Sequence, residues 1–339
     1  MKQFLMGNYV LAQAAKEAGA KVMFGYPITP ASEILEKWTD FCSENKNLSY
    51  LQAEDEMAAG FGTIGACLAG IPAFTATAGP GNVLMQDAFS MAEALRIPTV
   101  AMIMQRGGLS TSTVIYSQEE VRLTCFGGNG EGFRVVYSTA NLQELYDYTF
   151  KAFETAWQYR WPTFILADGY QGKMMGLVEM EEKNKQLLTE PILKKNVNLR
   201  NCYNLEEEIG AIIDNYRQEY QKVRSQIEEH ENYQLEGAKI ILIAHGIVAA
   251  ATKAAVDLLR KDKIPIGLFR PITLRPFPAQ AAIQALENAE KIVVLESAEG
   301  QLANLLKDEV KIPFPLIEYY KPAMGFAPEE IYEEIAKIS

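Results

Sequence analysis

Two short segments near the N-terminus carry side chains that could do acid–base chemistry together. The first, Tyr26-Pro27-Ile28-Thr29-Pro30, follows a predicted strand over residues 21–24, and the second, Glu54-Asp55-Glu56, follows a predicted strand over 48–52. Parallel strands end at a common edge of their sheet, and open α/β sheets hold ligands at that edge. The sequence therefore predicts a polar site there that contains a threonine and a glutamate.

Both segments are expected to open helices. The two prolines make the first turn rigid, and Thr29 or Ser32 is expected to cap a helix that starts near Pro30. Acidic side chains are favoured at any helix start by the macrodipole, so a solvated helix N-terminus is the alternative interpretation of Glu56. Against it, small and apolar residues follow from Met57 to Gly62. Such a helix packs closely, so we expect its start to be enclosed.

A third segment, Gln105-Arg106-Gly107-Gly108-Leu109-Ser110-Thr111, follows a predicted strand over residues 99–104. Arginine forms two parallel hydrogen bonds with a carboxylate, and hydroxyl side chains add single ones. The segment therefore suits a carboxylate substrate, with Arg106, Ser110 and Thr111 as candidate ligands. A surface loop is the alternative interpretation.

Two glycine-rich loops are less specific. Residues 78–82 follow a predicted strand over 73–76, but no lysine of a phosphate-binding loop follows them, so we predict a tight turn. Residues 127–132 are expected to form either a lid or a plain glycine-rich turn.

Composition excludes several classes of function. The chain has 339 residues and a net charge of −11, which gives a nucleic-acid role little electrostatic support. No signal peptide or run of ~20 apolar residues is evident, so we expect a soluble, cytoplasmic protein. The four cysteines are far apart and do not have metal-ligand spacing, so we expect no metal site and no iron–sulfur cluster within this chain.

The pattern of short apolar runs and amphipathic segments predicts an α/β fold with two doubly wound parallel-sheet domains. We place the first domain at residues 1–171, a charged linker at 172–237, and the second domain at 238–339. The linker is expected to contain one long helix over residues 205–233. Strands are predicted over residues 21–24, 48–52, 73–76, 99–104, 134–137 and 163–167, and then over 239–244, 264–269, 291–296 and 316–319.

Taken together, the Tyr26–Pro30 turn, the acidic segment and the Arg106-Gly107-Gly108 loop resemble the alpha subunit of 2-oxoacid:ferredoxin oxidoreductases. These thiamine diphosphate enzymes oxidatively decarboxylate 2-oxoacids such as 2-oxoisovalerate, 2-oxoglutarate or pyruvate to acyl-CoA. Residues 269–278 and Glu299-Gly300-Gln301-Leu302 extend the likeness to nearly the whole chain. The resemblance implies a pyrimidine-binding domain followed by a transketolase C-terminal-like domain.

The resemblance also implies roles for individual residues. Glu56 would bond N1′ of the cofactor's aminopyrimidine and act as the catalytic residue, since a shared proton there favours loss of the C2 proton. Thr29 would lie beside the substrate carbonyl, and Arg106 would hold the substrate carboxylate. The family turn implies cofactor contacts from Tyr26, Pro27 and Ile28.

The chain departs from the family pattern in two loops. It reads Leu109-Ser110-Thr111-Ser112 where relatives often have Pro-Ser-Thr-Gly, and Gly128-Asn129-Gly130-Glu131 where they often have Gly-His-Gly-Asp. Since both loops are expected to face the substrate, the identity of the 2-oxoacid is left open, as is the direction of the reaction.

The chain lacks the Gly-Asp-Gly pattern, with a following Asn, that binds the diphosphate through a metal ion, and it lacks cluster cysteines. The resemblance therefore implies a beta subunit that supplies Mg²⁺ and diphosphate binding, and a gamma or ferredoxin-like delta subunit that carries iron–sulfur clusters. Ferredoxin, CoA and a 2-oxoacid would complete the reaction. Another thiamine diphosphate enzyme, such as a 2-oxoacid decarboxylase or a lipoamide-linked dehydrogenase, is the nearest alternative, and a non-catalytic scaffold subunit is a third.

Overall fold

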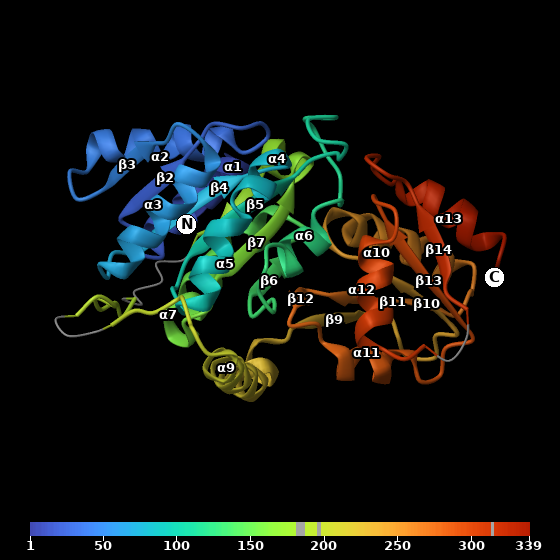
Figure 1. Ribbon diagram of the computed structural model, residues 1–339. Helices are drawn as coiled ribbons and strands as arrows, with labels where there is room; N and C mark the ends of the chain where they lie inside the picture. Colours follow the sequence, from blue (N-terminus) through green and yellow to red (C-terminus); the bar gives the residue numbers. More distant parts are fainter. Residues whose placement is uncertain (181–186, 195–197, 313–314) are drawn as a thin grey trace.

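The computed structural model describes residues 1–180, 187–194, 198–312 and 315–339. Residues 181–186 and 195–197 of the predicted linker, and 313–314 of the predicted second domain, lie outside this range. The helices and strands mostly alternate along the chain (Figure 1). Among the described helices, none is long and apolar enough to cross a lipid bilayer.

The elements of the first half are β1 (Lys2–Met6), α1 (Gly7–Glu17), β2 (Val22–Gly25), α2 (Ser32–Glu44), β3 (Ser49–Gln52), α3 (Glu56–Leu68), β4 (Ala73–Thr77), α4 (Pro80–Leu84), α5 (Gln86–Ala94), β5 (Val100–Gln105), α6 (Val121–Phe126), β6 (Val135–Ser138), α7 (Leu142–Tyr159), β7 (Thr163–Asp168), α8 (Gly169–Lys173) and β8 (Met175–Glu179). Those of the second half are α9 (Glu206–Ile227), β9 (His230–Tyr233), β10 (Ile240–Ile243), α10 (Gly246–Lys261), β11 (Ile266–Pro271), β12 (Thr273–Arg275), α11 (Ala279–Leu286), β13 (Lys291–Glu296), α12 (Gln301–Glu309), β14 (Ile317–Tyr320) and α13 (Pro328–Ala336).

The first sheet has the strand order β12-β6-β7-β5-β4-β2-β3, and the pairs from β6 to β3 are parallel. Gly25 at the end of β2 lies opposite Gln52 at the end of β3. This register confirms that the turns after these two strands share one edge of the sheet. A short antiparallel pair, β1 with β8, lies apart from it.

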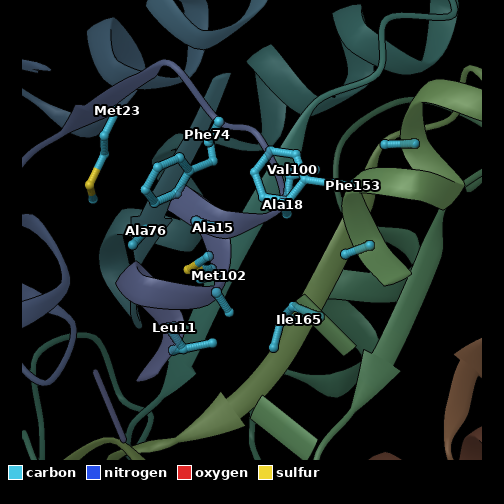
Figure 2. Close-up of a cluster of buried hydrophobic side chains, with 14 of the residues drawn as sticks. Leu11, Ala15, Ala18, Met23, Phe74, Ala76, Val100, Met102, Phe153 and Ile165 are labelled. Atoms are coloured by element: carbon cyan, nitrogen blue, oxygen red, sulfur yellow. The ribbon is translucent and has the colours of Figure 1, made fainter. Parts of the chain in front are cut away.

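The core of this sheet follows from the two-residue period of its strands. Val100, Met102 and Ile165 face α1 and α7 and pack with Leu11 and Phe153 (Figure 2). The alternate residues of the same strands face the opposite way, toward α3, α5 and α6, and contribute to a second cluster; these are Ala101, Ile103, Phe164 and Leu166. Strands β4, β5 and β7 are therefore buried on both faces, which is typical of a parallel sheet.

The second sheet has the order β14-β13-β10-β11-β9, in which β9 alone is antiparallel to its neighbour. The predicted α/β class with two mainly parallel sheets is thus confirmed, although each sheet also carries an antiparallel strand. The single helix predicted over residues 205–233 is wrong at its end, because α9 stops at Ile227 and β9 follows. The backbone leaves the helix there because the Glu229 carbonyl accepts hydrogen bonds from the N–H groups of Ile272 and Thr273, both at 3.0 Å.

Strand β12 joins the two halves of the molecule. It follows β11 of the second sheet, yet it pairs with β6 of the first, with Thr273 opposite Tyr137, and lies between the two halves in Figure 1. Leu274 of β12 packs in the same buried cluster as Phe164 and Ile241, which belong to different sheets. The halves therefore share a strand and a core, while the domain limits at residues 171 and 237 stay a prediction.

A buried arginine reinforces this junction. Arg270 on β11 is 1% exposed and donates to the Glu144 carboxylate on α7, with Nη1 to Oε1 at 2.8 Å, and to Glu231 Oε2 on β9 at 3.2 Å. Burial opposes ionisation of Glu144, but the bonds from Arg270 outweigh it and lower the pKa of that carboxyl. The ion pair thus holds α7 against the second sheet.

We expect Arg270→Met to lower the free energy of unfolding by about 3–5 kcal/mol at neutral pH, because it strands a partly buried carboxylate. The difference from wild type should shrink as the pH falls below the ordinary carboxyl pKa of 4.5, since protonated Glu144 no longer needs a cation. Urea denaturation at several pH values measures this. Arg217→Met, which removes an exposed pair with Asp214 on α9, is the control and should cost no more than about 0.5 kcal/mol. An equal loss of unfolding free energy in the two variants would show that the buried Arg270 ion pair contributes no more to stability than an exposed pair does.

Candidate functional site

The candidate site lies at the carboxyl edge of the first sheet, where the turns after β2, β4 and β5 come together. These strands are neighbours in the sheet and run parallel. Their last residues are Gly25, Thr77 and Gln105. Because the strands themselves are enclosed by helices, the polar side chains of the site come from the ends of these strands and of the neighbouring β3, and from the turns beyond them.

Glu56 is the buried member of its acidic segment. It opens α3 and is 5% exposed, whereas Glu54 and Asp55 are exposed. The helix is capped by Asp55, whose carboxylate accepts a hydrogen bond from the N–H of Ala58 at 2.7 Å. Since Asp55 performs the capping, the carboxylate of Glu56 is available for another partner, and it has no hydrogen bond within the described residues.

The turn after β4 lies directly against Glu56. A Cβ atom placed on Gly81 would stand 2.6 Å from Glu56 Oε1 and would also collide with Thr77 Oγ1. The Thr77 hydroxyl is buried without a hydrogen-bond partner. The sequence predicts only a tight turn at residues 78–82. The positive φ of Gly79, +52°, agrees with a turn, but the structure also makes this segment one wall of the site.

Arg106 lies beside the same turn. It is 5% exposed, and its Nη1 donates to the main-chain oxygen of Thr29 at 2.8 Å. A Cβ on Gly79 would stand 2.7 Å from its Nε, an atom that is buried without a partner. The structure therefore brings Thr29, Arg106 and the 79–81 turn together, with Arg106 against Gly79 and Glu56 against Gly81.

Sequence reasoning missed Glu120, the residue on which these turns converge. Its carboxylate accepts hydrogen bonds from the N–H of Gly79 at 2.8 Å, the N–H of Arg106 at 3.0 Å and the side-chain amide of Asn82 at 2.9 Å. Burial raises the pKa of Glu120, and these bonds oppose that shift. In the sequence Glu120 belongs to a polar run, Ser117-Gln118-Glu119-Glu120, that gives no sign of burial.

The other predicted site residues are less enclosed. Tyr26 and Pro27 are exposed, and Ile28 is half-buried. Ser110 and Thr111 are exposed on the loop beyond Arg106, and their side chains make no hydrogen bond among the described residues. They therefore form no hydrogen bond with Arg106 in this structure.

The predicted caps of the helix after the Pro30 turn are wrong. Helix α2 begins at Ser32, and its N-cap residue, Ala31, has no side chain that can cap. The turn that precedes α2 is instead held by two other hydrogen bonds. The Ala31 N–H donates to the Ile28 carbonyl at 2.8 Å, and the side-chain amide of Asn8 donates to the Pro30 carbonyl at 2.7 Å.

The glycine-rich loop at residues 127–132 is tied to α5. The N–H of Glu131 donates to Glu93 at 2.9 Å, and that of Asn129 donates to Ser90 at 3.3 Å. The loop, α5 and α9 also line a cavity of about 310 Å³. These bonds favour the plain turn over the lid.

Two family models match consecutive parts of the chain. Residues 13–240 match the family described as pyruvate flavodoxin/ferredoxin oxidoreductase, thiamine diP-bdg, and residues 238–325 match pyruvate:ferredoxin oxidoreductase core domain II. The first match covers more than half of the sequence and includes every candidate site residue named above.

Relatives whose names contain three different 2-oxoacids align over most of the chain. The ketoisovalerate oxidoreductase subunit VorB of Methanothermobacter marburgensis is 33% identical over 313 residues, covering 90% of this chain and 89% of the relative. The 2-oxoglutarate synthase subunit KorA of Methanocaldococcus jannaschii is 30% identical, covering 88% and 89%. The pyruvate synthase subunit PorA of the same organism is 27% identical, covering 86% and 81%.

Solved structures support the fold. A 2-oxoglutarate:ferredoxin oxidoreductase from Magnetococcus marinus superposes with a TM-score of 0.91 at 22% identity, covering 99% of this chain and 65% of that chain. A split-gene transketolase superposes with a TM-score of 0.61 at 13% identity, covering 99% and 98%. Both family models and the aligned relatives lead to one conclusion: the chain belongs to the 2-oxoacid:ferredoxin oxidoreductase family and is an alpha-type subunit of it, as its motifs predict.

Proposed function

We propose that this chain supplies half of a thiamine diphosphate site and, with partner subunits, converts a 2-oxoacid and CoA to acyl-CoA, CO₂ and reduced ferredoxin. One observation carries the proposal. Glu56 is buried, has no hydrogen-bond partner among the described residues, and contacts the turn of residues 79–81, against which Arg106 also packs.

The residues present fit the aminopyrimidine half of the cofactor. A buried carboxylate without an internal partner can share a proton with a ring nitrogen, and the lone Thr77 hydroxyl can accept or donate one hydrogen bond beside it. The absence of a side chain at Gly81 lets the Glu56 carboxylate and the Thr77 hydroxyl lie directly against this turn. When bound, thiamine diphosphate supplies a nucleophilic carbon that adds to the 2-oxo carbon and takes up the electrons released by decarboxylation.

Glu56, in this proposal, holds a proton at its carboxylate and exchanges it with the cofactor ring. Arg106 binds the substrate carboxylate, with Thr29 beside the 2-oxo group, and Ser110 and Thr111 add contacts at the far side of the loop. The buried Nε of Arg106 is a donor that still needs an acceptor, which supports this role. Tyr26, Pro27 and Ile28 line the cofactor from the turn after β2.

Exposed apolar side chains support a partner that covers the site. Tyr26 is 39% exposed, Met57 42%, Val83 57% and Leu109 96%. Each lies within three residues of a site residue or turn named above, where a free surface would favour polar groups. We assign this surface to a cytoplasmic beta subunit that binds Mg²⁺ and the diphosphate; gamma or delta subunits would carry the iron–sulfur clusters.

Reconstitution with the partner subunits tests the function. A panel of 2-oxoacids, including those of the named relatives, should yield acyl-CoA and reduce a viologen dye only when CoA and the partner subunits are present. Release of an aldehyde without dye reduction would favour a decarboxylase. Transfer of the acyl group to lipoamide would favour a dehydrogenase. Unchanged activity of the complex without this chain would favour a scaffold.

We expect Glu56→Gln to slow exchange of the cofactor C2 proton by roughly 10²–10⁴-fold, because an amide cannot share a proton as a carboxylate does. Exchange followed by NMR on the reconstituted complex measures this without requiring turnover. The exposed neighbour gives the control, Glu54→Gln, which should exchange at the wild-type rate. Wild-type exchange in Glu56→Gln would remove Glu56 from the chemistry.

Gly81→Ala should reduce the same exchange rate, because the added methyl group would displace the Glu56 carboxylate or the Thr77 side chain. Gly65→Ala on α3 is a matched control, since a Cβ there meets nothing within 4 Å. It should keep the wild-type rate and stabilise the chain by about 0.5–1 kcal/mol, as expected for alanine within a helix. If both variants exchanged alike, the contact between Gly81 and Glu56 would have no catalytic consequence.

Arg106→Lys should lower kcat/KM for the 2-oxoacid roughly 30-fold, because lysine keeps the charge but loses the planar guanidinium. This factor corresponds to a loss of about 2 kcal/mol in transition-state stabilisation. Both a higher KM and a lower kcat are expected, since binding and alignment suffer together. Steady-state kinetics on the complex measures this. Arg122→Lys, at an exposed pair with Asp308, is the control. Wild-type kcat/KM in both Arg106→Lys and Arg106→Ala would show that Arg106 does not bind the substrate and has only a structural role.

A further inference from the structure

Glu120 is a buried carboxylate behind the candidate site, and the proposed chemistry does not use it. We propose that Glu120 is a positioning residue that fixes Arg106 and the turn of residues 79–81 relative to Glu56. This inference rests on the proposed function of those residues and adds a group that neither touches the substrate nor binds the cofactor.

A single carboxylate oxygen joins two strands of the site. Glu120 Oε1 accepts from the N–H of Gly79, just beyond β4, at 2.8 Å and from the N–H of Arg106, just beyond β5, at 3.0 Å. Strand pairing between β4 and β5 ends before these residues. The carboxylate therefore replaces the sheet hydrogen bonds at the point where the segments that follow β4 and β5 would otherwise be free to separate.

The same contacts determine where the guanidinium lies. The Arg106 side chain packs on Gly79, whose missing Cβ would stand 2.7 Å from Nε, and reaches from there to the Thr29 carbonyl. Glu120 thus fixes both the main chain of Arg106 and the surface on which its side chain rests. Because Gly81 in the same turn contacts Glu56, a shift of Gly79 would also change the spacing between the arginine and the catalytic carboxylate.

The second oxygen of Glu120 is anchored by a chain of buried amides. Arg134 Nη1 donates to Gln86 Oε1 at 2.8 Å, Gln86 Nε2 donates to Asn82 Oδ1 at 2.8 Å, and Asn82 Nδ2 donates to Glu120 Oε2 at 2.9 Å. Arginine can only donate, and a carboxylate can only accept. The direction of every bond between Arg134 and Glu120 is therefore fixed by the two ends of the chain.

This fixed direction makes the carboxylate necessary. In Glu120→Gln the new amide must place its NH₂ group against Asn82 Nδ2 or against the two backbone N–H donors. Rotating the amides of Asn82 and Gln86 only moves the clash to Arg134, which cannot accept a hydrogen bond. Burial raises the pKa of the Glu120 carboxyl, whereas its hydrogen bonds and the nearby Arg106 oppose that shift. Glutamine has nearly the same size as glutamate, so the variant tests hydrogen bonding and charge rather than packing.

The experiment compares Glu120→Gln with Glu296→Gln in the reconstituted complex. Glu296 is a matched control, because it is also buried and also accepts two backbone N–H bonds, from Leu302 at 2.8 Å and Ala303 at 3.1 Å, at the start of α12. Hydrogen–deuterium exchange at Gly79 and Arg106 is measured by mass spectrometry without substrate, and kinetics are measured separately for the 2-oxoacid and for CoA.

In Glu120→Gln we expect exchange at both amides to accelerate by about 10-fold or more, as is typical when a bond to a buried charge is lost. We also expect kcat/KM for the 2-oxoacid to fall by at least about 10-fold while KM for CoA stays within about 2-fold. Glu296→Gln should change neither exchange at Gly79 and Arg106 nor the kinetics per assembled complex, although both variants are expected to be less stable.

Wild-type exchange at both amides in Glu120→Gln, or wild-type kcat/KM for the 2-oxoacid, would overturn the proposal. If Glu120→Gln does not assemble, Glu120→Asp keeps the charge, withdraws the carboxylate by one methylene, and is judged by the same readouts. The exchange measurement does not depend on turnover. Failure of the wild-type complex to act on any 2-oxoacid would therefore reject the proposed function while leaving the positional role of Glu120 separately tested.

Discussion

The burial of β4, β5 and β7 on both faces is the constraint on which the rest of the molecule depends. Apolar side chains from β5 and β7 fill the clusters on either side of the first sheet, and those of β4 fill the cluster on one side. A polar group buried along such strands loses its hydrogen bonds to water. The polar groups of the site therefore lie at the strand ends, as Thr77 does, and in the turns beyond them, and those turns must be held without the support of the sheet. Asn82 on α4, Gln86 on α5 and Glu120 at the N-cap of α6 supply that support.

Much of this arrangement could be predicted because it depends on neighbours in the sequence. The parallel strands, the common edge of the turns at Thr29 and Glu56, and the position of Arg106 directly after β5 all follow from local patterns. Glu120 could not be found in this way, since its partners Gly79 and Arg106 are 41 and 14 residues distant and its own segment looks like a solvated surface. The sequence predicts only a tight turn at residues 79–81 for a similar reason, because the contact of this turn with Glu56 is tertiary and two glycines alone do not reveal it.

Strand β9 illustrates the opposite case, in which local preference gave the wrong answer. The residues after Ile227 continue a charged, helix-compatible pattern, so the sequence predicts more helix. In the folded chain the Glu229 carbonyl is claimed by the N–H groups of Ile272 and Thr273, and β9 gains a full antiparallel pairing with β11. Tertiary hydrogen bonds of this kind outweigh helix propensity, which amounts to only ~0.7 kcal/mol or less for ordinary residues.

Strand β12 has a consequence for the way the chain is made. The edge of the first sheet at β6 is completed by Thr273–Arg275, which the ribosome releases long after β6 itself. Throughout that interval the first sheet of the nascent chain has an unpaired edge at β6. The sheet is complete only after β12, a segment of the other half, has been synthesised. Translation that stops before β12 leaves β6 with unpaired backbone groups that can recruit a strand from another chain. The two halves are thus coupled in biogenesis, and loss of the C-terminal half affects the sheet that bears the candidate site.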